Sequence, residues 1–187
     1  MKYENIINFE EVPQYDIADI LFESYQHLDT LYILPENCFK LFNCSIDFKY
    51  VGNWDTSNVE NMSYMFYASK FTGDISNWNT SKVKNMYSMF SNSKFNGDIS
   101  NWDTSNVINM SCMFEYSEFS GNISKWDTSN VKYMDFMFSY SKFDGDISNW
   151  DTSNVIYMSG MFAGSIFNKD ISKWNISDGI SMDDIFK

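Results

Sequence analysis

The sequence predicts an α/β solenoid of 24-residue units, each made of one short strand and one short helix. Two observations predict this fold class. Tryptophan recurs every 24 residues, at Trp54, Trp78, Trp102, Trp126, Trp150 and Trp174. Columns of valine, methionine, phenylalanine and isoleucine keep the same step, and a period of about 20 to 50 residues is typical of stacked-repeat proteins. We therefore expect units that bury their apolar side chains against neighbouring units.

The first half of each unit has the spacing of a short helix. In the first copy Val59, Met62, Met65 and Phe66 lie at i, i+3, i+6 and i+7, which places them on one helical face. Ser57 precedes this run, and a serine hydroxyl can accept a hydrogen bond from an N–H group of the first helical turn. We expect a helix of about two turns here in every copy.

The second half of each unit predicts a turn followed by a very short strand. Gly73-Asp74 is a dipeptide typical of turns, and residues 75–78 follow it. Because side chains alternate along a strand, Ile75 and Trp78 cannot both face inward on a regular one. We expect either a bend or bulge between them or a strand that ends before Trp78. Stacking would align these strands in a parallel sheet along one side of the solenoid.

The two ends of the chain depart from the repeat. Residues 1–50 are expected to form an N-terminal helical cap, in which residues 27–50 are a degenerate copy of the unit. Shifted by 24 positions, the methionine and phenylalanine columns fall there on Cys38, Leu41 and Phe42. Residues 51–187 hold six copies, and the incomplete last one is expected to act as the C-terminal cap. Otherwise that end is open to self-association.

The composition argues against several functions. A net charge of −12 repels phosphate backbones and anionic lipid, so no nucleic-acid partner is expected. The single histidine and the lack of a Gly-rich phosphate loop argue against hydrolytic, zinc and nucleotide chemistry, so we expect no enzymatic activity. The N-terminal residues do not resemble a signal peptide, and no apolar run approaches the roughly 20 residues of a membrane span. These features leave the compartment undetermined.

Two acidic columns have two competing explanations. One contains Asp74, Asp98, Asp146 and Asp170, and the other Asp55, Asp103, Asp127 and Asp151. Calcium between coils would relieve the repulsion of stacked carboxylates. Short acidic side chains that accept hydrogen bonds in turns explain the columns equally well. We predict no cofactor and no metal, with calcium as the alternative.

Differences between copies locate a candidate partner surface. The strand columns barely vary, whereas four columns on the expected helix exterior vary freely. A unique protein partner needs a non-repetitive surface with aromatic anchors. The predicted partner-binding residues gather in the middle copies and are Ile108, Tyr116, Tyr133, Phe136, Tyr140, Ile156 and Tyr157. Unconstrained drift of these positions is the alternative interpretation. A repetitive ligand, such as a glycan or a second copy, would instead suit the constant strand face.

The repeated string resembles a known family. Gly-Asp-Ile-Ser-Asn-Trp-Asp-Thr-Ser-Asn-Val, followed by Asn-Met and Met-Phe, is similar to the BspA-like leucine-rich-repeat surface proteins, in the variant common among mycoplasma-type surface lipoproteins. The resemblance covers roughly residues 51–187. It implies a leucine-rich-repeat-like solenoid at a microbial cell surface, with a role in interaction or adhesion. We expect a non-enzymatic scaffold for protein–protein interaction. The alternative is a structural component that self-associates through the solenoid ends or the sheet edge.

Overall fold

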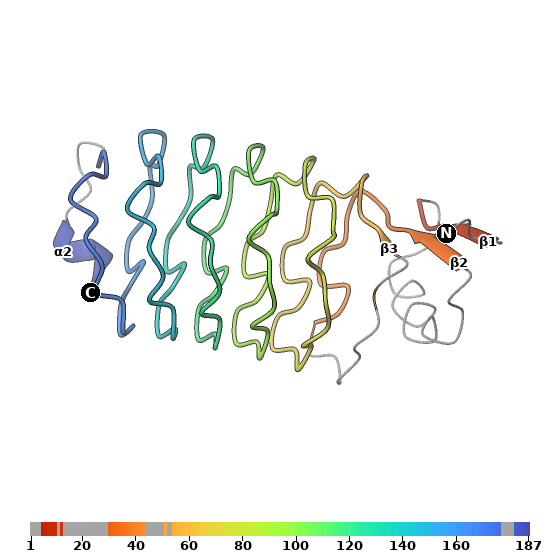
Figure 1. Ribbon diagram of the computed structural model, residues 1–187, viewed down its shortest axis with the longest axis horizontal. Coiled ribbons are helices and arrows are strands. Elements are labelled where there is room, and N and C mark those ends of the chain that lie inside the picture. Colours follow the sequence, from red (N-terminus) through yellow and green to blue (C-terminus); the bar gives the residue numbers. More distant parts are fainter. Residues whose placement is uncertain (1–4, 11, 13–29, 44–50, 52–53, 177–181) are drawn as a thin grey trace.

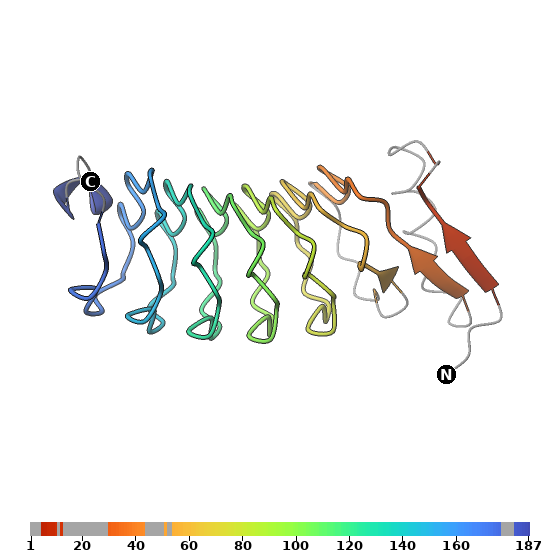
Figure 2. The same ribbon diagram turned by 90° about the horizontal axis from the view of Figure 1, so that it is seen from above.

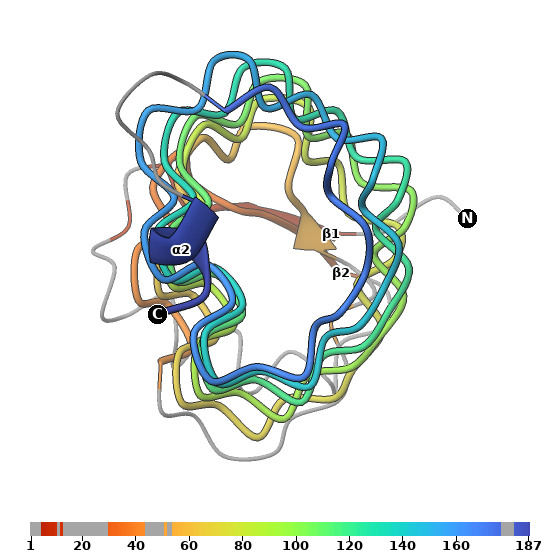
Figure 3. The ribbon, with the colours of Figure 1, turned by 90° about the vertical axis from the view of Figure 1, so that its left-hand side faces the viewer.

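The chain winds into a stack of coils that follows the 24-residue period. In the computed structural model the described residues are 5–10, 12, 30–43, 51, 54–176 and 182–187. Successive coils lie side by side along one long axis (Figures 1 and 2), and the view down that axis shows them superposed around a shared interior (Figure 3). Each coil therefore has two neighbours, and side chains at equivalent positions form columns along the stack.

Regular strands occur only at the N-terminal end of the described chain. Strands β1 (Asn5–Asn8), β2 (Thr30–Ile33) and β3 (Trp54–Asp55) form a parallel sheet in the order β1-β2-β3. Further along the stack, neighbouring coils meet in isolated parallel bridges at a single position per coil, namely Asn37↔Asn61, Asn61↔Asn85, Asn85↔Asn109, Asn109↔Tyr133 and Tyr133↔Tyr157. The expected sheet along one side of the whole stack is therefore not formed in the described residues.

The predicted α/β fold class, with a strand and a helix in every unit, is wrong. Among the described residues the only helix is α2 (Met182–Ile185), which lies at the C-terminal end. The segment expected to be helical in the first copy, Val59–Phe66, is instead a bridge followed by a run of turns. The equivalent segments of the second to fifth copies repeat this pattern, whereas α2 lies in the equivalent segment of the last copy. The leucine-rich-repeat-like expectation of one helix per unit is wrong for the same reason.

Hydrogen bonding between coils explains why no helix forms. The backbone N–H groups of Met62, Tyr64 and Phe66 donate to carbonyls of the next coil, at 2.9, 2.8 and 3.0 Å. The N–H groups of Met65 and Tyr67 instead donate three residues back within their own coil. A helix would direct every one of these donors four residues back. Carbonyls of the next coil accept three of these five donors, and carbonyls within the same coil's overlapping turns accept the other two.

The segment expected to be a short strand is a hydrogen-bonded turn. The N–H group of Trp78 donates to the carbonyl of Ile75 at 3.1 Å, and the Asp74 carboxylate accepts from the N–H group of Ser76 at 2.9 Å. The chain therefore bends between Ile75 and Trp78, which lets both side chains point inward. Ile75 and Trp78 are both buried.

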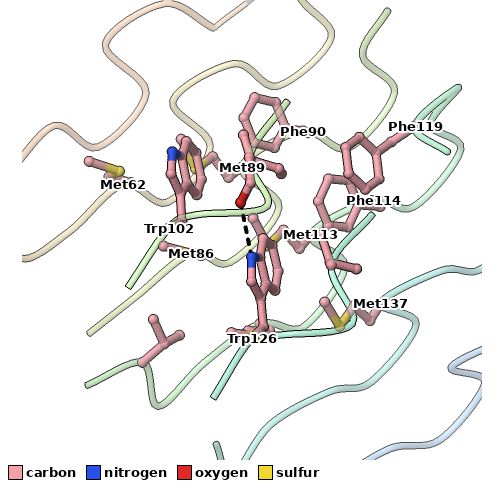
Figure 4. Close-up of a cluster of buried hydrophobic side chains, with 14 of the residues drawn as sticks. Met62, Met86, Met89, Phe90, Trp102, Met113, Phe114, Phe119, Trp126 and Met137 are labelled. Carbon is pink, nitrogen blue, oxygen red and sulfur yellow. Dashed lines mark hydrogen bonds between the residues drawn. The ribbon is translucent and has the colours of Figure 1, made fainter. Parts of the chain in front are cut away.

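The core consists of continuous columns of identical side chains. Phe66, Phe90 and Phe114 stack at 5.5 and 5.8 Å between ring centroids, and Trp102 and Trp126 stack at 6.5 Å with nearly parallel planes. Figure 4 shows methionines between these rings. Offset aromatic pairs contribute about 0.5–1.5 kcal/mol each beyond the burial of their area. Because every coil adds one more pair to each column, the columns hold neighbouring coils in register.

The two ends of the stack differ. Cys38, Leu41 and Phe42 are buried, and the N–H group of Cys38 donates to the carbonyl of Asn61 at 2.8 Å. Residues 13–29 and 44–50 of the expected N-terminal helical cap lie outside the described residues, so the division of the chain at residue 50 stays a prediction. At the other end, the N–H group of Phe162 donates to the carbonyl of Ile185 in α2 at 2.8 Å. Whether this last copy serves as a cap also stays a prediction.

Candidate interaction surface

One side of the stack carries most of the variation between coils, and we call it the turn face. It consists of residues 60–68 of the first copy and the equivalent residues 84–92, 108–116, 132–140 and 156–164. Two of its columns have left-handed backbone with φ between 51 and 62°, namely Tyr64, Ser88, Cys112, Phe136 and Gly160, and Ala68, Asn92, Tyr116, Tyr140 and Gly164. A positive φ at the third position of a turn is the geometry of a type II turn, which favours glycine or asparagine.

Three of the predicted partner-binding residues form what we call the aromatic ridge: Tyr116, Phe136 and Tyr140. Tyr116 and Tyr140 are 54% and 56% exposed, and their rings stack in parallel at 4.8 Å. The rings of Phe136 and Tyr140 lie over Gly160 and Gly164 of the next coil, where an added Cβ would collide with them. Two rings of the ridge therefore pack on the glycine backbone of the next coil.

The other four predicted residues lie at one edge of the same face. Tyr133 and Tyr157 stack at 5.6 Å on the column of isolated bridges. Ile108 and Ile156 share the neighbouring column and are separated by Lys132. The structure brings the predicted residues together on one face. All of them except the half-buried Tyr133 are exposed. Their role in binding stays a prediction.

A groove that the sequence did not indicate lies beside the ridge. It has a volume of about 500 Å³ and is lined by residues of three successive coils, namely Tyr64, Tyr67, Tyr87, Ser88, Ser91, Asn92, Glu115 and Tyr116. The Tyr64 ring meets the rings of Tyr67 and Tyr87 edge to face, at 5.6 and 5.0 Å. Since Tyr116 belongs to both features, the groove and the ridge form one continuous surface.

Two side chains that line the groove, Glu115 and Tyr87, have shifted pKa values, and so does Cys112, which lies outside the lining. Burial raises the pKa of the Glu115 carboxyl, although hydrogen bonds with Cys112 and Ser91 oppose the shift. Burial, followed by the charge of Glu115, raises the pKa of the Cys112 thiol to about 11. A side-chain hydrogen bond with Tyr64, followed by burial, raises the pKa of Tyr87. Among the residues that line the groove, Glu115 alone has a carboxyl group, and the other polar groups are hydroxyls and one amide.

The helical interpretation concealed part of the groove, because four of its lining residues lie outside the columns expected on the helix exterior: Tyr67, Tyr87, Ser91 and Glu115. Residue 87 lies four positions after Val83 and three before Phe90, so a helix would bury it with them. The column that contains Tyr67, Ser91 and Glu115 also varies, but the helical interpretation does not place it on the exterior. Glycine at positions 160 and 164 was the available signal for left-handed turns, because glycine in a helix interior costs about 1 kcal/mol relative to alanine.

The acidic columns act within turns. The carboxylates of Asp74, Asp98, Asp146 and Asp170 each accept a hydrogen bond from the backbone N–H group two residues later, at 2.9–3.0 Å. Asn122 replaces aspartate in this column and accepts the same bond at 3.0 Å. These backbone hydrogen bonds lower the pKa of the four aspartates. Within the described ranges no three His, Cys, Asp or Glu residues are grouped so that they could hold a metal ion.

Comparison with known proteins identifies a family. The model of the family described as "Mycoplasma protein of unknown function, DUF285" matches residues 36–140 and 115–187. No curated protein and no solved structure matches the chain. In the part of the chain that the structure describes, no helix is long and apolar enough to cross a membrane.

Proposed function

The chain belongs to this family of unknown function, and from that premise we propose that it is a non-enzymatic scaffold that binds a protein partner through its turn face. The likeness of its repeat to BspA-like surface proteins supports a partner at a microbial surface, in recognition or adhesion. The near identity of successive coils supports a role without catalysis, because catalytic carboxylates need unequal environments.

The aromatic ridge is the observation that carries the proposal. A residue other than glycine in left-handed backbone costs roughly 1–2 kcal/mol. Phe136 and Tyr140 adopt φ values of 54 and 51°, whereas the next coil has glycine at both equivalent positions. Folding would therefore favour glycine there, and the large rings remain partly in solvent. Exposed aromatic side chains are typical anchors of protein interfaces.

A double substitution tests the proposal. Phe136→Gly with Tyr140→Gly gives the fourth copy the residues of the fifth. The free energy of unfolding should change little. Glycine relieves the left-handed backbone by about 1 kcal/mol per position, and the lost ring contacts cost about the same. A partner captured from an extract of the source organism would be identified by mass spectrometry, and its affinity measured with purified proteins. We expect the double variant to bind it at least about 100-fold more weakly.

A matched control occupies the same left-handed column. Ala68→Gly makes an equivalent backbone change at φ 53°, in a coil that contributes no ring to the ridge and at a position that does not line the groove. It should bind the partner as the unchanged chain does. Equal affinity of the double variant and the control would overturn the assignment of the ridge.

Self-association through the C-terminal end is the second candidate. Position 166 is isoleucine and 62% exposed, whereas the equivalent positions of earlier copies are Lys70, Lys94, Glu118 and Lys142. Ile166→Lys restores the charge of that column. If the stack assembles end to end, sedimentation should show a size that increases with concentration and falls with Ile166→Lys. A monomer at every concentration would contradict this candidate.

A further inference from the structure

We propose that the tyrosine groove binds the cationic head of a lysine or arginine side chain from the partner, an inference that rests on the proposed function for the existence of a protein partner. The groove presents several tyrosine rings and one carboxylate, and it adjoins the aromatic ridge through Tyr116. The proposal thus assigns a chemistry to the partner: a basic side chain next to apolar ones.

The tyrosine rings provide the first argument. The negative face of an aromatic ring attracts an ammonium or guanidinium group within about 6 Å of its centroid. The chain already makes such a contact on Tyr64, which lines the groove: the Lys40 ammonium lies 5.3 Å from the centroid of the Tyr64 ring and 5.1 Å from that of Phe39. Tyr67 and Tyr87 meet the Tyr64 ring edge to face and extend the aromatic wall into the groove.

Glu115 provides the second argument, because no lysine in the described part of the chain pairs with its carboxyl group. Other carboxylates of the stack pair with lysines of neighbouring coils, as Glu60 does with Lys84 and Glu118 with Lys94. No lysine amine among the described residues lies within 4 Å of a carboxyl oxygen of Glu115. A half-buried carboxylate is poorly solvated, and a bound cation would compensate for the lost water.

Charge complementarity selects the occupant. A net charge of −12 and the negative charge of Glu115 disfavour an acidic or phosphorylated ligand. A purely apolar side chain would leave the carboxylate in contact with neither water nor a cation. A basic side chain satisfies both constraints, because its aliphatic stem can pack on tyrosine rings while its charged end reaches the carboxylate.

Small peptides test the groove without the unidentified partner. The probes are acetyl-Gly-Lys-Gly-amide, its arginine counterpart and the norleucine peptide, in which the amine is absent. NMR titration should show saturable shifts of Tyr64, Tyr87 and Glu115 with the basic peptides, and at least about tenfold weaker binding of the norleucine peptide. Equal shifts with the basic and norleucine peptides would overturn the proposal.

Two glutamate variants provide a matched comparison. Glu115→Gln removes the groove carboxylate, whereas Glu118→Gln removes an exposed carboxylate that already pairs with Lys94. We expect Glu115→Gln to weaken the basic peptides at least about tenfold, with Glu118→Gln within about twofold of the unchanged chain. Equal effects of the two variants would mean that the charge acts only at long range, and would overturn the site.

The outcomes separate this inference from the proposed function. The ridge variant Phe136→Gly with Tyr140→Gly should keep peptide binding in the groove while it loses the partner. If that variant no longer binds the partner, and the groove binds the basic and norleucine peptides equally well, the scaffold function is supported and the cation site is refuted. If peptide binding depends on Glu115 but the ridge variant still binds the partner, the cation site is supported and the role of the ridge in the proposed function is refuted.

Discussion

Four tryptophans of the repeat join two coils through their indole N–H groups, namely Trp102, Trp126, Trp150 and Trp174. Trp102 and Trp126 donate from Nε1 to the carbonyls of Ile75 and Ile99 in the preceding coil, at 3.1 and 3.0 Å (Figure 4 shows the second bond). Trp78 occupies the same column and is equally buried, yet its Nε1 has no partner in the described part of the chain. One column thus contains both a bonded and an unbonded indole.

This difference predicts unequal effects of the same substitution. Trp102→Phe removes a hydrogen bond together with some packing, whereas Trp78→Phe removes similar packing and an unpaired buried donor. The free energy of unfolding should fall further in Trp102→Phe, by about 1–2 kcal/mol. Chemical denaturation of the two variants measures the difference, and the shared change in volume makes each the control of the other. A larger loss in Trp78→Phe would contradict the assigned hydrogen bonds.

Residue by residue, the sequence predicted burial better than conformation. Val59, Met62, Met65 and Phe66 are all fully buried, as their spacing indicated. The residue type at Phe136 does not predict its φ of 54°, because aromatic residues do not favour left-handed backbone. The surrounding stack imposes that conformation, and only the glycines of the fifth copy reveal it.

At the scale of the element, a helix and a run of turns bury the same columns. The spacing of Val59, Met62 and Phe66 is compatible with both. What distinguishes them is the destination of the backbone donors, and carbonyls of the next coil accept those of Met62, Tyr64 and Phe66. A helix of two turns is marginal by itself. The hydrogen bonds between coils depend on a partner about 24 residues away. The spacing of apolar residues within one unit does not predict them.

The turns that replace the expected strands predict a dependence on pH. Asp74, Asp98, Asp146 and Asp170 accept backbone N–H groups, which lowers their pKa below the ordinary value of 3.8. Protonation then occurs more readily in the unfolded chain, so their stabilisation is full above pH 3.8 and is lost as the pH falls through the lowered values. We expect the melting temperature to fall steeply with acidification in that window.

Asparagine separates this effect from general acid denaturation. Asn122 shows that an amide oxygen accepts the same turn bond without titrating in this range. A variant with the four aspartates replaced by asparagine should therefore keep its fold and show a flatter dependence of melting temperature on pH below 4. Parallel curves for the variant and the unchanged chain would show that these turns do not contribute to the acid sensitivity.

At the scale of the whole molecule, the candidate surface belongs to no single coil. The groove takes its lining from three coils, and the ridge takes Tyr116 from one coil and Phe136 and Tyr140 from the next. Comparison of copies located the variable side chains, since the columns themselves are visible in the sequence. It did not reveal which columns become neighbours across coils, because that depends on the path of the turns. The groove was missed for this reason.

A stack held by nearest neighbours should tolerate the removal of one whole coil but not of half a coil. Deletion of residues 121–144 joins Ser120 to Gly145 and keeps every column in register, while it removes Phe136 and Tyr140 and spares the groove. We expect a cooperative fold that is less stable by roughly 1–4 kcal/mol and that binds the lysine peptide but not the partner. Deletion of residues 121–132 shifts the apolar columns by half a period and should abolish cooperative unfolding, as circular dichroism would show. If both deletions fold equally well, stacking of like columns does not hold the molecule together.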